Sequence, residues 1–157
     1  IRIRVEEALR YYGNFGECLY CRSLRQELAD GVRIVVENSS FAAFLPYAAL
    51  SPFHLWIFPK RHGACFSNIA HGELEQLAVI LKEVLLRVDV GLEDPDYNVI
   101  FRSLPPEEGS VKYFHWYLSI VPRVTRAAGF ELGTGMFINT ALPEKSAEFL
   151  RGIRLPG

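Results

Sequence analysis

Two cysteines two residues apart are the first side chains whose spacing could support chemistry. Cys18 and Cys21 are the two ends of the run CLYC. A separation by two residues lets two thiolates bind one Zn²⁺ at about 2.3 Å. A tetrahedral site needs two more ligands. The histidines of the chain are the candidates: His54, His62, His71 and His115. The residues themselves leave open which two take part, or whether these histidines only make structural hydrogen bonds.

The same cysteine pair could instead be a redox motif. A thioredoxin-type CxxC lies beside a βαβ unit, and the sequence around Cys18 and Cys21 predicts no parallel crossover. The third cysteine, Cys65, stands alone, so the chain has no disulfide framework. We therefore expect a reducing cytoplasm as the location of the protein.

The run KYFHWYLSIVPR, from Lys112 to Arg123, places a histidine in an alternating apolar segment. Side chains of a strand alternate between its two faces. One face then carries Phe114, Trp116, Leu118 and Ile120, which we expect in the core. The other carries Tyr113, His115, Tyr117 and Ser119, and we expect it to be polar, aromatic and half-buried. A histidine on such a face is by default a structural residue whose hydrogen bonds are satisfied by its neighbours.

Hydrophobic periodicity predicts the elements that must position these residues. Helices are predicted at Val5 to Tyr12, Ser23 to Ala29, Gly72 to Val90 and Pro143 to Arg151. The first two flank a glycine-bounded loop that carries both cysteines. Strands are predicted at Val32 to Asn38, Ser40 to Tyr47, His54 to Lys60, from Tyr97 onward, and at Lys112 to Val121. The predicted fold is α+β, an antiparallel sheet of about five strands with packed helices.

Composition limits the possible functions. The chain has 157 residues, half of them hydrophobic, which suits one domain. Its formal charge of -1 lacks the excess of basic residues that nucleic-acid binding needs. The longest apolar run, Leu77 to Val90, contains four charged residues, so we expect no membrane span. The N-terminus is not typical of a secretion signal. Because the sequence opens at Ile1 without methionine, we expect a fragment of a longer chain.

Short motifs follow one another along nearly the whole chain. In order they are the CxxC pair, Glu37-Asn38, the run PKRH ending at His62, a long helix, Tyr97-Asn98, His115-Trp116, Gly129-Phe130-Glu131, and Pro143 to Arg151. Their order and spacing resemble the galactose-1-phosphate uridylyltransferases of the histidine-triad superfamily, whose chains have two related halves. The closing motifs resemble the C-terminal half. The resemblance implies one histidine-triad-like domain, residues 1–157, which forms that half of a nucleotidyltransferase.

For the metal, the resemblance implies a closed site of Cys18, Cys21, His62 and His115. The family takes its ligands from a CxxC pair, from a histidine that ends the PKRH strand, and from the first histidine of the histidine motif. With no open coordination position, such a Zn²⁺ would be structural and would not activate water.

For catalysis, the resemblance implies a half without a nucleophile. The catalytic half carries His-x-His-x-Gln, and its second histidine takes up the nucleotide covalently. Here Tyr117 and Ser119 stand at the positions of that histidine and of the glutamine. A phenol with a pKa near 10 is a poor replacement for an imidazole. We expect Tyr117 to pack across strands.

For the substrate, the resemblance implies that Phe130 and Glu131 reach across a dimer to the sugar phosphate held by the partner's catalytic half. A carboxylate suits neighbouring sugar hydroxyls. Asn98 is a further candidate, although an asparagine that closes a turn is an alternative reading. Phe137 stands where the family has a glutamine.

Three functions remain open from the sequence. The chain could be part of a hexose-1-phosphate nucleotidyltransferase, a homodimer that uses a nucleotide sugar and a hexose 1-phosphate. It could be a module that binds a nucleotide or a sugar phosphate without turnover. It could be an interaction domain stabilised by zinc. The length of the native gene separates the first from the others, and ligand binding separates the second from the third.

Overall fold

A computed structural model describes residues 2–125 and 128–155. It opens with two helices, α1 (Arg2–Phe15) and α2 (Leu19–Asp30), both longer than predicted. The prediction of a loop that carries both cysteines is wrong at Cys21, which lies in the first turn of α2. Only Cys18 precedes the helix, as its N-cap residue.

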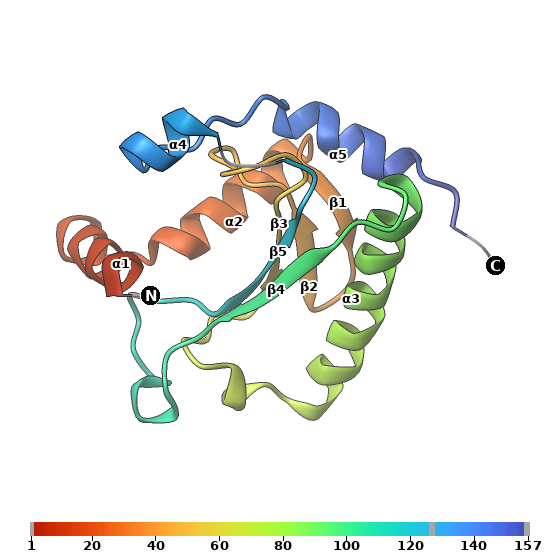
Figure 1. Ribbon diagram of the computed structural model, residues 1–157. Helices are drawn as coiled ribbons and strands as arrows, with labels where there is room; N and C mark the ends of the chain where they lie inside the picture. Colours follow the sequence, from red (N-terminus) through yellow and green to blue (C-terminus); the bar gives the residue numbers. More distant parts are fainter. Residues whose placement is uncertain (1, 126–127, 156–157) are drawn as a thin grey trace.

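Five strands form one antiparallel sheet, as predicted. They are β1 (Ile34–Glu37), β2 (Phe41–Phe44), β3 (Leu55–Pro59), β4 (Tyr97–Arg102) and β5 (Tyr117–Pro122). Their order across the sheet is β1-β2-β3-β5-β4, so β4 lies at an edge (Figure 1). The turn between β1 and β2 is closed by Asn38, whose Oδ1 accepts hydrogen bonds from the backbone N–H groups of Ser40 and Phe41 at 3.0 and 2.8 Å. This local hydrogen bonding is what asparagine does in turns.

The strand that contains the histidine motif starts later than predicted. β5 begins at Tyr117, and the five residues 112–116 before it are not part of the strand. The backbone N–H of Trp116 donates instead to the carbonyl of Gly63 at 2.8 Å, in the segment that follows β3. This contact places the residue before it, His115, beside that segment.

The remaining helices lie after the third strand. α3 (His71–Gly91) and α5 (Pro143–Gly152) match the predicted helices, whereas α4 (Gly129–Thr134) was not predicted. Two short 3-10 helices, η1 (Phe66–Asn68) and η2 (Pro106–Glu108), complete the elements. Gly135 caps the C-terminal end of α4, and its φ of +71° is a conformation that glycine adopts without strain.

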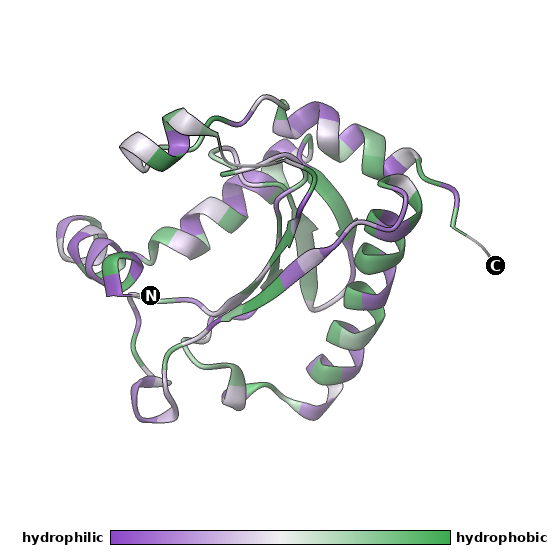
Figure 2. Ribbon diagram, in the orientation of Figure 1, coloured by the Kyte–Doolittle hydropathy of each residue, from purple (hydrophilic) through white to green (hydrophobic). Residues whose placement is uncertain are grey.

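Helices cover both faces of the sheet, as Figure 1 shows with α3 on one side and α1 and α2 on the other. On the first side, α3 and α5 bury apolar residues such as Val84 and Leu150 against Leu118 and Ile120 of β5. On the second side, α1 and α2 contribute a separate core around Tyr117. Figure 2 shows the central strands in hydrophobic colours between more polar outer helices. No described helix combines the length and the hydrophobicity that a membrane crossing requires.

The face of β5 that carries Tyr117 is more deeply buried than predicted. Tyr117 and Ser119 have exposed fractions of 0% and 2%, so the expectation of a half-buried face is wrong there. The physical reason is that Tyr20 of α2 packs onto it, with 5.5 Å between the ring centroids of Tyr20 and Tyr117.

Candidate metal centre and its surroundings

The start of α2 brings the two cysteine sulfurs together. Cys18 is the N-cap residue with extended backbone angles (φ -70°, ψ 124°), and Cys21 is the third residue of the helix. Side chains at these two positions of a helix meet, as they do in a capping box. The unpaired N–H groups and the positive end of the dipole at a helix start also favour thiolates there.

His62 reaches the same place from the segment that follows β3. Its Nδ1 lies 3.1 Å from the Sγ of Cys21, and the ligand atoms of Cys18, Cys21 and His62 all lie within 4.8 Å of one another. The Nε2 of His62 lies 3.2 Å from the carbonyl oxygen of Val111. That carbonyl can only accept, so Nε2 carries a proton and Nδ1 is the ring nitrogen that faces the sulfurs, an orientation typical of metal-ligating histidines.

His115 approaches the cluster from the other side. Its Nδ1 lies 3.3 Å from the Sγ of Cys21, its side chain is fully buried, and its Nε2 has no hydrogen-bond partner among the described residues. The group of atoms within 4.8 Å of one another contains Cys18, Cys21 and His62 but not His115. His115 therefore contacts one sulfur of the cluster and lies at its margin.

The pKa values of Cys18 and His115 are lowered, toward the thiolate and the neutral imidazole that bind a cation, whereas those of Cys21 and His62 are raised. Hydrogen bonding from Cys21 lowers the pKa of Cys18 to about 5, and burial opposes this shift. The hydrogen bond with Cys18 raises the pKa of Cys21, and burial raises it further. The Cys18 thiolate also accepts a hydrogen bond from His62 and so raises the pKa of His62. Burial, followed by the charge of His62, lowers the pKa of His115 to about 3.

This donor set fits zinc by its chemistry and its spacing. Ligands of a tetrahedral Zn²⁺ lie about 3.4–3.8 Å from one another, given bonds of about 2.1 Å to nitrogen and about 2.3 Å to sulfur. The two sulfur–nitrogen distances of 3.1 and 3.3 Å are close to that range. A divalent cation would also remove the repulsion between two neighbouring thiolates.

Tyr117 packs across strands, as predicted. Its ring stacks on Phe58 of β3 with 4.6 Å between centroids and an interplanar angle of 11°, and it contacts Trp56 at 5.0 Å. Its hydroxyl accepts a hydrogen bond from Nη1 of Arg4 in α1 at 3.2 Å. Burial raises the pKa of Tyr117, so the group is a neutral phenol and a weak nucleophile at pH 7.

The three candidate substrate residues lie on two different elements. Phe130 and Glu131 belong to α4, where the Phe130 side chain is 48% exposed. Oε2 of Glu131 accepts a hydrogen bond from the backbone N–H of Ala128 at 2.9 Å and so caps the helix. Asn98 lies on β4, opposite Val121 of β5, and is exposed. No described hydrogen bond joins Asn98 to Glu131.

Three further residues, His54, Arg102 and Arg4, lie on this face of the sheet. His54 is buried and lies 2.8 Å from the hydroxyl of Ser119, measured from Nε2. Arg102 of β4 lies directly opposite Tyr117, and Arg4 comes from α1. Strand alternation along the predicted strand from Tyr97 would have placed Arg102 and Asn98 on one face. The arrival of Arg4 depends on tertiary packing and has no signal in the sequence.

Known proteins with similar sequences form a consistent group. Residues 4–151 match the family described as the galactose-1-phosphate uridyl transferase, C-terminal domain. The chain is 32% identical to an ADP-glucose phosphorylase of Arabidopsis thaliana over 154 residues, which cover 97% of this chain and 42% of that protein. It is 28% identical to a galactose-1-phosphate uridylyltransferase of Thermotoga maritima over 159 residues, which cover 96% of this chain and 49% of that one. The chain thus spans less than half the length of both relatives.

Solved structures extend the likeness to the fold. The ADP-glucose phosphorylase of Arabidopsis thaliana with bound ADP-glucose matches with a TM-score of 0.83 and 31% identity, over 97% of this chain and 48% of that one. A uridylyltransferase matches with a TM-score of 0.88 and 27% identity, over 96% and 49%. A Zn-bound histidine triad family protein from Mycobacterium smegmatis, at 21% identity and a TM-score of 0.56 over 85% and 90%, shares the fold.

Proposed function

The chain belongs to the galactose-1-phosphate uridyl transferase C-terminal domain family, and from this membership we propose that it is the nucleophile-free half of a hexose-1-phosphate nucleotidyltransferase. In this proposal residues 1–157 are one histidine-triad-like domain, and a catalytic half with His-x-His-x-Gln precedes it in the native protein. The complete enzyme uses a nucleotide sugar and a hexose 1-phosphate in a reducing cytoplasm.

The observation that carries the proposal is the environment of Tyr117. A nucleotidyl group is transferred through a nucleophile that is accessible and easily deprotonated or already basic. Tyr117 is fully buried, stacked on Phe58, and its phenol accepts a hydrogen bond from Arg4. The imidazole before it, His115, faces the sulfur of Cys21. Neither side chain is free to attack a phosphorus atom, which supports a binding role for this half.

We assign the zinc site to Cys18, Cys21, His62 and His115. Zn²⁺ supplies a cross-link when bound, and a set of four protein ligands leaves no position for water or substrate. The chain's own contribution is to hold the donors: α2 orients both sulfurs, the Val111 carbonyl orients His62, and the Trp116–Gly63 hydrogen bond keeps the two histidine segments adjacent. The site would tie α2 to the end of the sheet.

We assign part of the sugar-phosphate site to Phe130 and Glu131, with Asn98 as a further contact. The segment around α4 is unusually apolar for a surface. Its exposed hydrophobic residues are Phe130, Leu132, Met136, Phe137, Ile138 and Leu142. An exposed apolar segment of this size is typical of a protein interface, which supports a homodimer in which α4 meets the partner's catalytic half.

Substitution of Glu131 tests this assignment in the complete protein. We expect Glu131→Ala to lower kcat/KM for the hexose 1-phosphate by about tenfold or more, since hydrogen bonds from sugar hydroxyls to a carboxylate are lost. The content of Zn²⁺ should not change.

The control for this test is Glu131→Gln. Glutamine retains an oxygen that can accept from the Ala128 N–H, so this variant separates the loss of the α4 cap from the loss of the charged group. We expect an intermediate kcat/KM. An unchanged kcat/KM in Glu131→Ala would remove Glu131 from the sugar site.

A further inference from the structure

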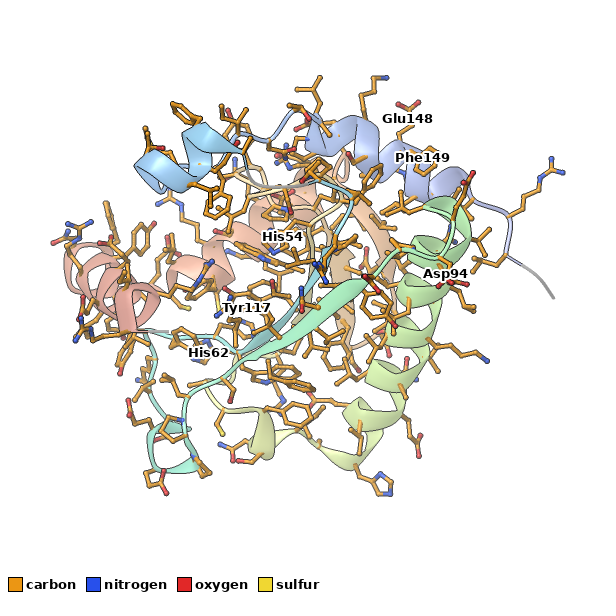
Figure 3. All side chains as sticks on the ribbon, viewed as in Figure 1. His54, His62, Asp94, Tyr117, Glu148 and Phe149 are labelled. Atoms are coloured by element: carbon orange, nitrogen blue, oxygen red, sulfur yellow. The ribbon has the colours of Figure 1, made fainter. Side chains whose placement is uncertain are left out.

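One face of the sheet carries cationic and polar side chains that neither the zinc site nor α4 uses. Strand pairing places Arg102 of β4 opposite Tyr117 of β5, and Trp56 of β3 opposite Ser119. The side chain of Arg4 reaches this face from α1 and donates to the Tyr117 hydroxyl at 3.2 Å. Figure 3 shows His54, Tyr117 and His62 following one another along the side of the sheet that α1 and α2 cover.

His54 presents an N–H group that has no acceptor. The indole N–H of Trp56 donates to Nε2 of His54 at 3.2 Å, and because an indole only donates, Nε2 must be an acceptor. Burial, followed by the charges of Arg4 and Arg102, lowers the pKa of His54 to about 4, so the ring is neutral at pH 7. Its proton therefore sits on Nδ1. That atom is buried and has no hydrogen-bond partner among the described residues.

Arg102 presents a second donor without an acceptor. Its Nε is buried and has no partner in the part of the chain that the structure describes. Other partly buried arginines of the protein bind carboxylates closely. Arg33 contacts Glu27 at 2.8 Å, and Arg87 contacts Glu83 at 2.8 Å. Within residues 2–125 and 128–155, neither Arg4 nor Arg102 forms a salt bridge.

These unsatisfied groups share one chemical character. A buried donor without a partner costs about 1–3 kcal/mol, and more when it is charged, and such groups in native proteins call for an explanation. The orphan groups of His54 and Arg102 are both N–H donors, and two guanidinium charges lie within electrostatic reach of the His54 ring. What would satisfy all of them is an anion that offers several oxygen acceptors.

The backbone next to His54 is also strained. Phe53 has a φ of +57°, in the left-handed region that bulky residues rarely adopt. Strain of this kind costs about 1–3 kcal/mol and gathers at sites where a neighbouring side chain is held in place for a purpose. Here the neighbour that it positions is His54.

We propose that Arg4, His54 and Arg102 form a binding site for the phosphoryl group of a small phosphorylated ligand; we call these residues the inner-face site. The guanidinium groups supply the charge, and the Nδ1–H of His54 and the Nε–H of Arg102 supply directed hydrogen bonds. Arg102 is half-buried on the edge strand β4, directly opposite the buried Tyr117. The site is independent of zinc and of Glu131, and it does not rest on the transferase proposal.

Tryptophan gives a direct test in the 157-residue chain. The protein has two tryptophans: Trp56 donates to His54 in the inner-face site, whereas Trp116 lies in the core on the opposite face of the sheet. In a ¹H–¹⁵N correlation spectrum at pH 7, inorganic phosphate should move the indole signal of Trp56 saturably, with a Kd below about 1 mM. The Trp116 signal should stay in place. Trp56→Phe assigns the two signals.

Two variants test the arginines. Arg4→Gln and Arg102→Gln should each weaken phosphate binding at least tenfold. The matched controls are Arg10→Gln, which removes the same charge from an exposed position of α1, and Arg123→Gln, an exposed arginine just after β5. Both controls should bind phosphate as the unchanged chain does. If Arg102→Gln fails to fold, Arg4→Gln alone decides the outcome.

Two results would overturn the proposal. One is a Trp56 shift that sodium chloride at equal ionic strength reproduces, or no shift at all. The other is unchanged phosphate binding in Arg4→Gln. Glucose 1-phosphate and AMP distinguish the source of the phosphoryl group: tighter binding of the first assigns a sugar phosphate, tighter binding of the second assigns a nucleotide, and equal binding assigns the phosphoryl group alone. All three results support a phosphoryl site.

Discussion

Replacing Cys18 or Cys21 with serine is expected to release bound Zn²⁺ and to lower the free energy of unfolding by several kcal/mol, since the binding free energy of a structural metal is part of the folding free energy. The effect is large because Cys21 contacts both histidines, at 3.1 and 3.3 Å, and so links α2 to two distant segments of the chain. Metal analysis of the purified chain and denaturant unfolding measure the two quantities.

The third cysteine provides the control for this experiment. Cys65 is buried but lies outside the cluster, with its sulfur 3.0 Å from the hydroxyl of Ser67. Cys65→Ser should therefore retain one Zn²⁺ per chain. Retention of a full equivalent of Zn²⁺ by Cys18→Ser, or failure of the unchanged chain to bind added Zn²⁺, would contradict the assignment of the site.

The second large effect is expected at Arg33, which joins α2 and α5. Its Nε donates to Glu27 of α2 at 2.8 Å and its Nη1 to Glu144 of α5 at 2.7 Å, with only 11% of the Arg33 side chain and 8% of the Glu27 side chain exposed. Arg33→Met should cost about 3–5 kcal/mol of unfolding free energy, because it leaves the Glu27 carboxylate buried without its partner.

The pH dependence of this variant has a definite sign. Burial raises the pKa of Glu27, and the hydrogen bond from Arg33 opposes that shift. Without Arg33, the folded state binds a proton at Glu27 more readily than the unfolded state does, so stability falls as pH rises. The loss in Arg33→Met should therefore shrink on acidification from pH 7 to about 5.

An exposed pair serves as the comparison for Arg33. Arg25 contacts Glu17 with 64% and 35% of their side chains exposed, so Arg25→Met should cost less than about 1 kcal/mol. The double variant Arg33→Met, Glu27→Leu should recover most of the lost stability, since no buried charge remains. A loss below 1 kcal/mol in Arg33→Met alone would show that the pair contributes little.

Helices and strands whose hydrophobic residues recur with a clear periodicity were predictable from the sequence. The period of α3 and the short apolar runs between turn residues predicted the long helix and the antiparallel sheet, because one periodic face must be buried whatever the rest of the chain does. Asn38 marked the β1–β2 turn through its own hydrogen bonds, which are local.

Features that depend on long-range contacts were not predictable in the same way. The run before Tyr117 alternates like a strand, yet it leaves the sheet where the Trp116 N–H bonds Gly63. Cys21 was expected in a loop, but α2 already begins at Leu19, directly after the N-cap residue Cys18, whose side chain makes no capping hydrogen bond. α4 has six residues, two of them glycines, and thus little helical signal of its own.

In the candidate metal centre, too, the local part was predictable from the sequence and the long-range part was not. The spacing of Cys18 and Cys21 predicted that both sulfurs meet one cation, and the capping geometry of α2 explains why they do. The sequence left four histidines open. The positions of His62 and His115 next to Cys21 depend on the end of β3 and the start of β5 lying side by side, which only the folded sheet provides.

The most direct test of the central claim, a half without a nucleophile, is the intact mass of the denatured chain after incubation with ADP-glucose or a uridine diphosphate sugar. The buried phenol of Tyr117 and the sulfur-facing imidazole of His115 cannot take up a nucleotidyl group. We therefore predict a single mass, that of the unmodified chain. A species heavier by one nucleotidyl group, on Tyr117 or on any other residue, would contradict the account.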